Sequence, residues 1–236
     1  MTERGFREAS HITRELTIVW NPESLMHLII RRLLCNQVVR SHFGIDRAPI
    51  VEAWYQRHVF YTLFPKRFGR RTQTEDTFEW ILSLVSDGSG AVEPRELIHL
   101  FNAARDAQIR RLEMGHAQPG GDLLFDLVAF GEALSEVSQA RLRQTVYAEH
   151  PNYKPWIERL VGERTEHTMR SLASVWSVNE REAGRRVERL VAIGVLQPSG
   201  ARTAPLYRLP VIYRPALGLL AGTSWVHLRG APSEVT

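Results

Sequence analysis

Apolar side chains recur at intervals of three and four residues along most of this chain, and this periodicity restricts the possible folds more than any other feature. The clearest stretch is residues 94–114, where one face carries Leu97, Ile98, Phe101 and Ala104. Pro94 suits the first position of a helix, because its missing N–H is not needed there. The spacing predicts a long amphipathic helix over this stretch and a mostly α fold for the chain.

The same periodicity predicts further helices before residue 150. They are expected over residues 22–42, 50–64, 74–85 and 122–150, the last with a kink near Ser138. Asn21 can cap the first of them, and a short β-prone run from Leu16 to Trp20 precedes it. The basic stretch from Lys66 to Arg71 lacks a helical pattern, and we interpret it as a solvated connection rather than a phosphate site.

After residue 150 the pattern changes to short elements. A short helix around Trp156 precedes a helix over residues 165–175 and a third helix, which Asn179 can cap, over residues 179–191. Residues 193–196 then lead into Gln197-Pro-Ser-Gly200, and residues 206–209 look like the returning strand of a small β-hairpin. This order of elements is typical of a winged-helix domain. We therefore expect a helical domain over 1–150, a winged-helix domain over 151–222 and a C-terminal tail over 223–236.

Composition favours a soluble, cytoplasmic protein. No apolar stretch reaches the roughly 20 residues that a membrane helix needs, and no apolar segment of a secretory signal follows Met1. The net charge of +4 and the pI of about 9.6 permit a nucleic-acid or acidic partner without requiring one. The single cysteine, Cys35, lies within the first predicted helix, and we interpret it as a buried helix residue rather than a reactive thiol.

Residues that carry catalysis or bind metals do not occur here in the required spacing. The histidines form no H-E-x-x-H or comparable metal-ligating pattern, and no G-x-S-x-G sequence marks a nucleophile. There is no G-x-x-x-x-G-K-[ST] sequence, since the only lysines, Lys66 and Lys154, follow no glycine-rich turn. No hydrophobic strand ends in a paired acidic Walker-B signature. The sequence predicts no metal site, no catalytic residues and no ATP hydrolysis by this chain alone.

Three sets of residues together resemble the C-terminal half of a bacterial family of STAND/AAA+-like P-loop ATPases. The first is Leu16-Thr-Ile-Val-Trp20 with the apolar helix that follows it. The second is Phe78-x-Trp80-Ile81, Asp87-Gly88 and Pro94-Arg95-x-Leu97-Ile98. The third is Leu190-x-x-x-Gly194-x-Leu196 at the end of the winged-helix pattern. The resemblance covers about residues 14–220 and implies a helical lid followed by a winged helix.

The resemblance also implies a role for Arg95. In such ATPases an arginine that follows a proline at the start of a lid helix, the sensor-2 position, reaches the phosphates of nucleotide held by the neighbouring core. Because the phosphate-binding turn of the core is missing here, the resemblance implies a non-catalytic regulatory component that contacts ATP and Mg²⁺ only through a partner carrying the core. An ion pair of Arg95 with Glu93 or Glu96 is the alternative interpretation.

Four arginines on the third helix of the winged-helix pattern give a second hypothesis. Spacings of four and five residues place them over a broad outward face: Arg181, Arg185, Arg186 and Arg189. Contact with the phosphates of double-stranded DNA would make the chain a winged-helix DNA-binding regulator. Intrahelical pairs with Glu180, Glu182 and Glu188 are the alternative interpretation, and a purely structural adaptor is a third hypothesis.

Overall fold

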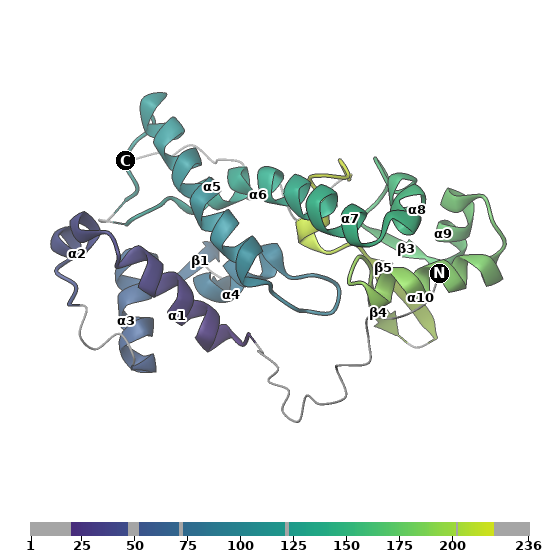
Figure 1. The fold of residues 1–236 in the computed structure, drawn as a ribbon, viewed down its shortest axis with the longest axis horizontal. Helices are drawn as coiled ribbons and strands as arrows, with labels where there is room; N and C mark the ends of the chain where they lie inside the picture. The colour runs from purple at the N-terminus through teal and green to yellow at the C-terminus, as the bar shows by residue number, and fades with distance from the viewer. Residues whose placement is uncertain (1–19, 47–51, 71–72, 121–122, 202, 220–236) are drawn as a thin grey trace, which may run out of the picture.

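The computed structural model describes residues 20–46, 52–70, 73–120, 123–201 and 203–219. It is mostly helical, with a small three-stranded antiparallel sheet near the C-terminus (Figure 1). The helices before residue 150 form one end and the middle of the molecule, and the sheet with its helices forms the other end. The strand expected from Leu16 lies outside the described residues, apart from Trp20, and so does the expected tail over 223–236.

The first predicted helix is in fact two helices, α1 (Pro22–Leu33) and α2 (Gln37–Phe43). Asn21 caps α1 as expected, through a reciprocal pair of hydrogen bonds with Ser24. The prediction of one continuous helix was wrong because the side chain of Asn36 accepts hydrogen bonds from the amides of Val38 and Val39 and so starts a new helix. Cys35 lies in the turn between the two helices and is exposed, so its interpretation as a buried helix residue was also wrong.

A two-stranded hairpin follows α3 (Ala53–Leu63), where the sequence predicted a solvated connection. Strands β1 (Arg67–Arg70) and β2 (Gln73–Asp76) pair in antiparallel register, with Arg67 opposite Asp76. Asp76 then caps α4 (Thr77–Val85) by accepting hydrogen bonds from two amides of its first turn. The prediction failed because these strands lack alternation of apolar and polar residues, the usual signal of a half-buried strand.

The helical part comprises the described residues before Pro151. Its core lies between α3, α4, α5 (Pro94–Glu113) and α6 (Leu127–Ala140). Aromatic rings fill it in edge-to-face and tilted contacts, with centroids 4.8 to 6.2 Å apart. The rings belong to Phe60, Phe64, Phe78, Trp80, Phe101, Phe125 and Phe130. The long helix predicted at Pro94 is confirmed, and it packs along α6.

The helix α6 continues without interruption into a π-helical turn, η2 (Arg141–Val146), and the short helix α7 (Tyr147–Glu149). This continuous rod carries the chain from the helical part to the C-terminal end (Figure 1). The irregularity expected near Ser138 is thus a π-helical turn that begins three residues later. Ser138 itself is buried, and its hydroxyl accepts a hydrogen bond from the amide of Ala216 at 2.9 Å.

The C-terminal unit, residues 151–219, begins with η3 (Pro151–Tyr153) and α8 (Lys154–Glu158). Its remaining elements are β3 (Glu166–Thr168), α9 (Met169–Trp176), α10 (Glu180–Ala192), β4 (Gln197–Ala201), β5 (Ala204–Arg208) and η4 (Val211–Tyr213). The strands lie in the order β3-β5-β4. Asn179 caps α10 as predicted. The helix expected to start at residue 165 starts at Met169 instead, because Thr168 caps it and residues 166–168 pair with β5.

Two glycines allow the C-terminal unit to approach the helical part closely. The amide of Gly88 donates to the carbonyl of Gly194 at 2.7 Å, and a Cβ at Gly88 would overlap the carbonyl oxygen of Leu196. Gly194 has φ +71°, and a Cβ there would lie 2.6 Å from Oδ2 of Asp87. The loop after α4 therefore fits the connection between α10 and β4 only while both positions lack side chains.

The last described segment also joins the two parts. It was expected to close against the winged-helix domain, and it does so only in part, because η4 packs against α4, α6 and η2 of the helical part. Tyr213 and Leu217 are both buried, and the carbonyl of Leu217 accepts a hydrogen bond from the amide of Gly162 in the C-terminal unit at 2.9 Å. Among the helices in the described part of the chain, none is long and apolar enough to cross a membrane.

Candidate functional site

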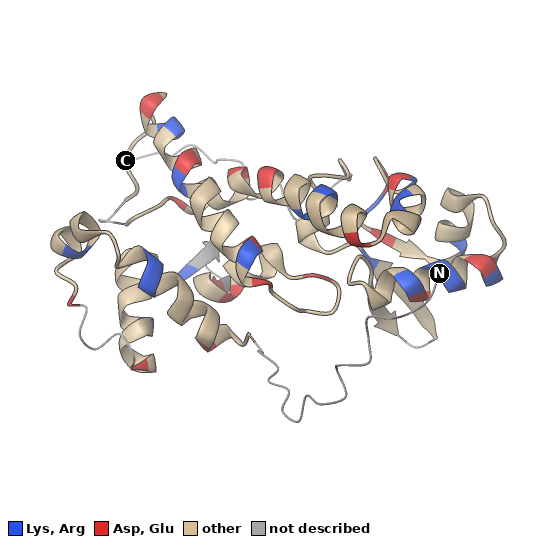
Figure 2. Ribbon diagram, viewed as in Figure 1, with Lys and Arg blue, Asp and Glu red and all other residues tan. Residues whose placement is uncertain are grey.

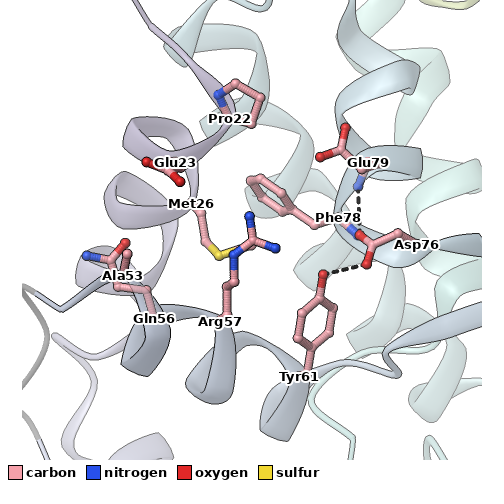
Figure 3. Close-up of a pocket in the computed structure, with 10 residues that line it drawn as sticks. All are labelled: Pro22, Glu23, Met26, Ala53, Gln56, Arg57, Tyr61, Asp76, Phe78 and Glu79. Carbon is pink, nitrogen blue, oxygen red and sulfur yellow. Dashed lines mark hydrogen bonds between the residues drawn. The ribbon is translucent and has the colours of Figure 1, made fainter.

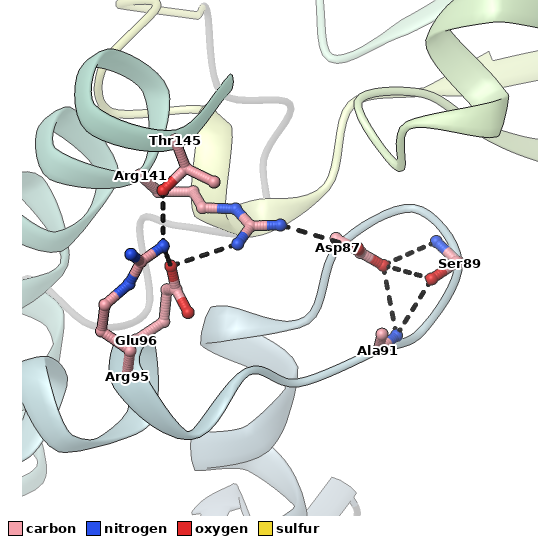
Figure 4. A network of polar contacts seen from close by, with 7 residues as sticks. All are labelled: Asp87, Ser89, Ala91, Arg95, Glu96, Arg141 and Thr145. Atoms are coloured by element: carbon pink, nitrogen blue, oxygen red, sulfur yellow. Dashed lines mark hydrogen bonds and ion pairs between the residues drawn. The ribbon is translucent and has the colours of Figure 1, made fainter. Parts of the chain in front are cut away.

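Arg95 lies in the first turn of α5, where the sequence placed the candidate nucleotide contact. Its Nη2 donates to Oγ1 of Thr145 at 2.7 Å and to Oε1 of Glu96 at 3.2 Å (Figure 4). The ion pair with Glu96, which was the alternative interpretation, is thus present. The side chain of Arg95 is nevertheless 68% exposed, so most of its guanidinium still faces solvent. Glu93, the residue before α5, occupies the cap position without forming a side-chain hydrogen bond to the helix.

Glu96 and Arg141 form the buried centre of this polar network. Nη1 of Arg141 lies 3.1 Å from Oε1 of Glu96, and Nη2 lies 3.8 Å from Oδ2 of Asp87. The side chains of Glu96 and Arg141 are only 5% and 11% exposed. The other oxygen of Asp87 accepts from the amide and hydroxyl of Ser89, which orders the loop after α4. Two arginines and two carboxylates therefore balance their charges at the boundary between the two parts.

The electrostatics of the network keep Arg141 charged. Burial opposes the charged form, but the charge and hydrogen bond of Glu96 favour it, and the pKa of Arg141 lies above its ordinary value. Burial raises the pKa of Tyr213, although the charge of Arg141 acts in the opposite direction, so the phenol stays neutral. Tyr213 thus brings the C-terminal segment next to the cation without adding a negative charge.

Arg141 and Thr145 gave no signal in the sequence, whereas Glu96 was expected only as a partner of Arg95 and Asp87 only as part of a motif. Arg141 and Thr145 both belong to the π-helical turn η2, which is the kind of irregularity that often occurs at functional sites. One signal was available for Glu96, because it shares a helical face with Leu100 and Ala104, four and eight residues later, and both are buried. A carboxylate in line with an apolar face requires a partner, although the sequence could not identify it.

The arginines of α10 separate into two groups. Arg181, Arg185 and Arg189 are exposed and follow one another at intervals of four residues. Arg186 turns inwards instead: its guanidinium lies 5.1 Å from the ring centre of Trp156 and 5.9 Å from that of Trp176. The expectation that Arg186 faces outwards was wrong, because two aromatic faces and Glu182 hold it in the packing between α8, α9 and α10.

The intrahelical pairs that the sequence suggested occur at one position. Glu182 pairs with Arg185 at 3.4 Å and with Arg186 at 3.2 Å. Within the described residues, neither Glu180 nor Glu188 forms an ion pair with these arginines. The outward arginines of α10 are therefore mostly free of intrahelical partners.

Lys and Arg alternate with Asp and Glu along both parts of the molecule (Figure 2), but the net positive charge belongs to the C-terminal unit. Residues 151–219 contain eleven Lys and Arg against six Asp and Glu, a net charge of +5. The whole chain has 30 Lys and Arg against 26 Asp and Glu, a net charge of +4, so the remaining residues carry a net charge of −1. The basic excess of the chain thus lies at one end of the molecule.

A small cavity of about 210 Å³ lies between α1, α3 and α4 (Figure 3). Arg57 points into it, and the hydroxyl of Tyr61 donates to Oδ2 of Asp76 at 2.6 Å. Burial, followed by this hydrogen bond, raises the pKa of Tyr61. Since the other oxygen of Asp76 caps α4, both oxygens serve the local structure rather than a ligand. Among the described residues, no three His, Cys, Asp or Glu side chains are grouped so that they could hold a metal ion.

Known proteins offer no further guide to this site. Comparison of the chain with protein-family models, with curated proteins and with solved structures gave no match. The resemblance to P-loop ATPases therefore rests on the residues quoted for it, and a function has to be argued from the geometry of the two arginine sites.

Proposed function

We propose that the chain is a non-catalytic regulatory component of a P-loop ATPase switch, built from a helical lid-like bundle and a winged helix. In this proposal Arg95 contacts the phosphates of nucleotide that the core of a partner protein holds. The phosphate-binding turn and Mg²⁺ ligands belong to that partner, and the network around Arg95 links the nucleotide to the C-terminal unit.

The element order of the C-terminal unit supports the winged-helix part of the proposal. A helix, a short strand, two helices and a hairpin follow one another as α8, β3, α9, α10, β4 and β5. The first strand pairs with the last, which gives the order β3-β5-β4. The helices α9 and α10 pack against each other across a tight turn in which Ser177 adopts φ 53°. These features match a helix-turn-helix with an attached β-hairpin.

The observation that carries the proposal is the exposed guanidinium of Arg95 at the N-terminus of a 20-residue helix. A cation in the first helical turn lies at the positive end of the helix dipole, which disfavours it by about 0.3–1 kcal/mol. An anion bound there would interact favourably with both the helix end and the arginine. Thr145 and Glu96 orient one nitrogen of Arg95 and leave the others available to a phosphate.

The contacts around Arg95 also supply a route for regulation. Glu96 accepts from both Arg95 and Arg141, so a phosphate that attracts Arg95 competes with Glu96 for it. Glu96 would then interact more strongly with Arg141, which otherwise also faces Asp87. Because the loop of Asp87 contacts the connection after α10, a change at Arg95 can bias how the C-terminal unit sits on the helical part.

The test begins with the pure full chain, which should release no phosphate from ATP and Mg²⁺. The tagged chain is then used to recover a partner that contains a Walker motif, and the affinity of the purified pair is measured with ATPγS, with ADP and without nucleotide. Arg95→Ala should weaken the ATPγS-dependent affinity by at least about tenfold, the value of one charged hydrogen bond, and leave the nucleotide-free affinity unchanged.

The matched control is Arg105→Ala, which removes an exposed arginine from the same helix, where it pairs with Asp106. This variant should behave like the parent. ATP hydrolysis by the pure chain, or equal ATPγS dependence in the Arg95→Ala and Arg105→Ala variants, would refute the proposal.

A further inference from the structure

We infer that α10 presents a binding face for double-stranded DNA, formed by Arg181, Arg185 and Arg189. The inference does not depend on Arg95 or on a partner that holds nucleotide. The opposite face of α10 is buried through Ala183, Val187 and Leu190, so the helix is fixed in the unit and shows solvent one continuous side.

The spacing of the three arginines suits a DNA groove. At 1.5 Å per residue, successive arginines are about 6 Å apart along the helix axis, and the first and last are about 12 Å apart. The major groove of B-DNA is about 12 Å wide and admits an α-helix. On the same outward face, the exposed Ala192 has no long side chain that would keep the helix away from a duplex.

These arginines are available to bind phosphate. Arg181 and Arg189 have no ion pair with any residue in the described part of the chain, and Arg185 has only the 3.4 Å contact with the half-exposed Glu182. A phosphate can therefore bind these arginines without breaking more than one weak ion pair. A solvated surface is the ordinary explanation for exposed arginines, but it does not account for a net charge of +5 in residues 151–219 against −1 in the rest of the chain.

Duplex DNA suits this face better than single-stranded nucleic acid. Proteins that bind single strands stack the bases on exposed aromatic rings, and the outward face of α10 carries no aromatic residue. The nearest aromatic residues are occupied: Tyr153 stacks on Trp156 with centroids 5.0 Å apart, and Arg186 covers Trp156. Arg186 therefore positions α8 against α10 and does not contact phosphate.

A change at Glu188 should alter the affinity for DNA in the direction opposite to changes at the three arginines. It is exposed and lies among the three arginines on the outward face of α10. A carboxylate there repels a phosphate backbone, so removing its charge should strengthen DNA binding. A variant that merely disturbed the fold would weaken binding, so a gain of affinity is specific to this model.

The experiment measures fluorescence anisotropy of a labelled duplex of about 20 base pairs with the full chain between about 50 and 200 mM salt. Three phosphate contacts predict a slope of about −2.7 for the logarithm of the association constant against the logarithm of salt concentration. Each single Arg→Gln change at positions 181, 185 and 189 should reduce the slope by about 0.9, and the triple variant should lose most of the affinity. Glu188→Gln should bind about threefold more tightly at low salt.

Arg105→Gln is the matched control, because it removes one exposed positive charge outside the C-terminal unit, and it should bind DNA like the parent. Circular dichroism melting checks that the triple variant is folded. Absence of duplex binding at about 50 mM salt, or unchanged binding by the folded triple variant, would overturn the inference. Tighter binding of polyglutamate than of the duplex at equal charge concentration would also overturn it and assign the face to an acidic protein.

Discussion

The helical part and the C-terminal unit differ in the burial and the ion pairing of their arginines. In the helical part, Arg141 is buried and neutralised by Glu96 and Asp87. On α10 of the C-terminal unit, Arg181 and Arg189 extend into solvent without an ion pair among the described residues. A buried, paired charge holds the surrounding structure in place. An exposed, unpaired charge can bind a ligand without breaking an ion pair. Arg95 lies between these extremes, since it is tied to the buried network and still mostly exposed.

The strongest test of the comparison removes the buried cation. Arg141→Met would leave the carboxylate of Glu96 buried without its main partner, and we expect it to reduce the free energy of unfolding by about 3–5 kcal/mol. The double variant Arg141→Met with Glu96→Gln should recover part of this loss, because the buried carboxylate of Glu96 is gone while Asp87 still lacks its cation. Urea unfolding of both variants and of Arg105→Met measures the difference. If Arg141→Met costs no more than Arg105→Met, Arg141 does not act as a buried structural charge.

The contact between the two parts should depend on Gly88. A methyl group there overlaps the carbonyl oxygen of Leu196, so Gly88→Ala should lower the free energy of unfolding by about 2–3 kcal/mol. The matched control is Gly131→Ala, in the interior of α6 with no atom within 4 Å of the new Cβ. That change should stabilise the protein by about 0.5–1 kcal/mol, since alanine favours helix more than glycine does. Thermal or urea unfolding should give opposite signs, and equal effects would contradict the close approach.

Neighbouring arginines on α10 should differ in their effect on stability. Arg186→Ala removes the contacts with Trp156 and Trp176 and should cost about 1–2 kcal/mol. Arg185→Ala should stay within about 0.5 kcal/mol of the parent, because its side chain is 64% exposed. When both variants are compared at equal concentrations of folded protein, Arg185→Ala should weaken DNA binding more than Arg186→Ala. Equal stability effects would remove the distinction between the inward and outward groups.

The smallest expected effect is a pH dependence that comes from His167. This residue is buried, Nδ1 lies 2.9 Å from Oγ of Ser171, and Nε2 lies 2.9 Å from the carbonyl of Arg164. Burial lowers its pKa from the ordinary value of 6.5. The unfolded chain therefore binds the proton more readily, so the stability contribution is complete above pH 6.5 and decreases as the pH falls towards the folded pKa.

Unfolding at several pH values checks this expectation, with His167→Gln as the comparison. The variant should have a lower free energy of unfolding than the parent at neutral pH. Below pH 6.5, its free energy of unfolding should decrease less steeply with falling pH than that of the parent. Identical pH profiles would show that His167 does not carry this dependence.

Local signals identified most of the helices. Asn21, Pro94 and Asn179 mark helix starts that the structure confirms, because capping and proline preference act within a few residues along the chain. The break between α1 and α2 also has a local cause in the cap at Asn36, but the continuous apolar spacing concealed it. The strands were harder to identify, since β1, β2 and β3 are short and their pairing depends on partners elsewhere in the chain.

Local sequence signals predicted where helices begin, which faces are apolar and which residues could recognise a ligand by charge. What those charges do depends on contacts that form only in the folded chain. Glu96 meets Arg141 across 45 positions, and Arg186 meets Trp156 across 30, so neither contact could be read from local spacing. The physical reason is that the interaction energy of a charge depends on burial and on its nearest opposite charge, which are properties of the folded chain.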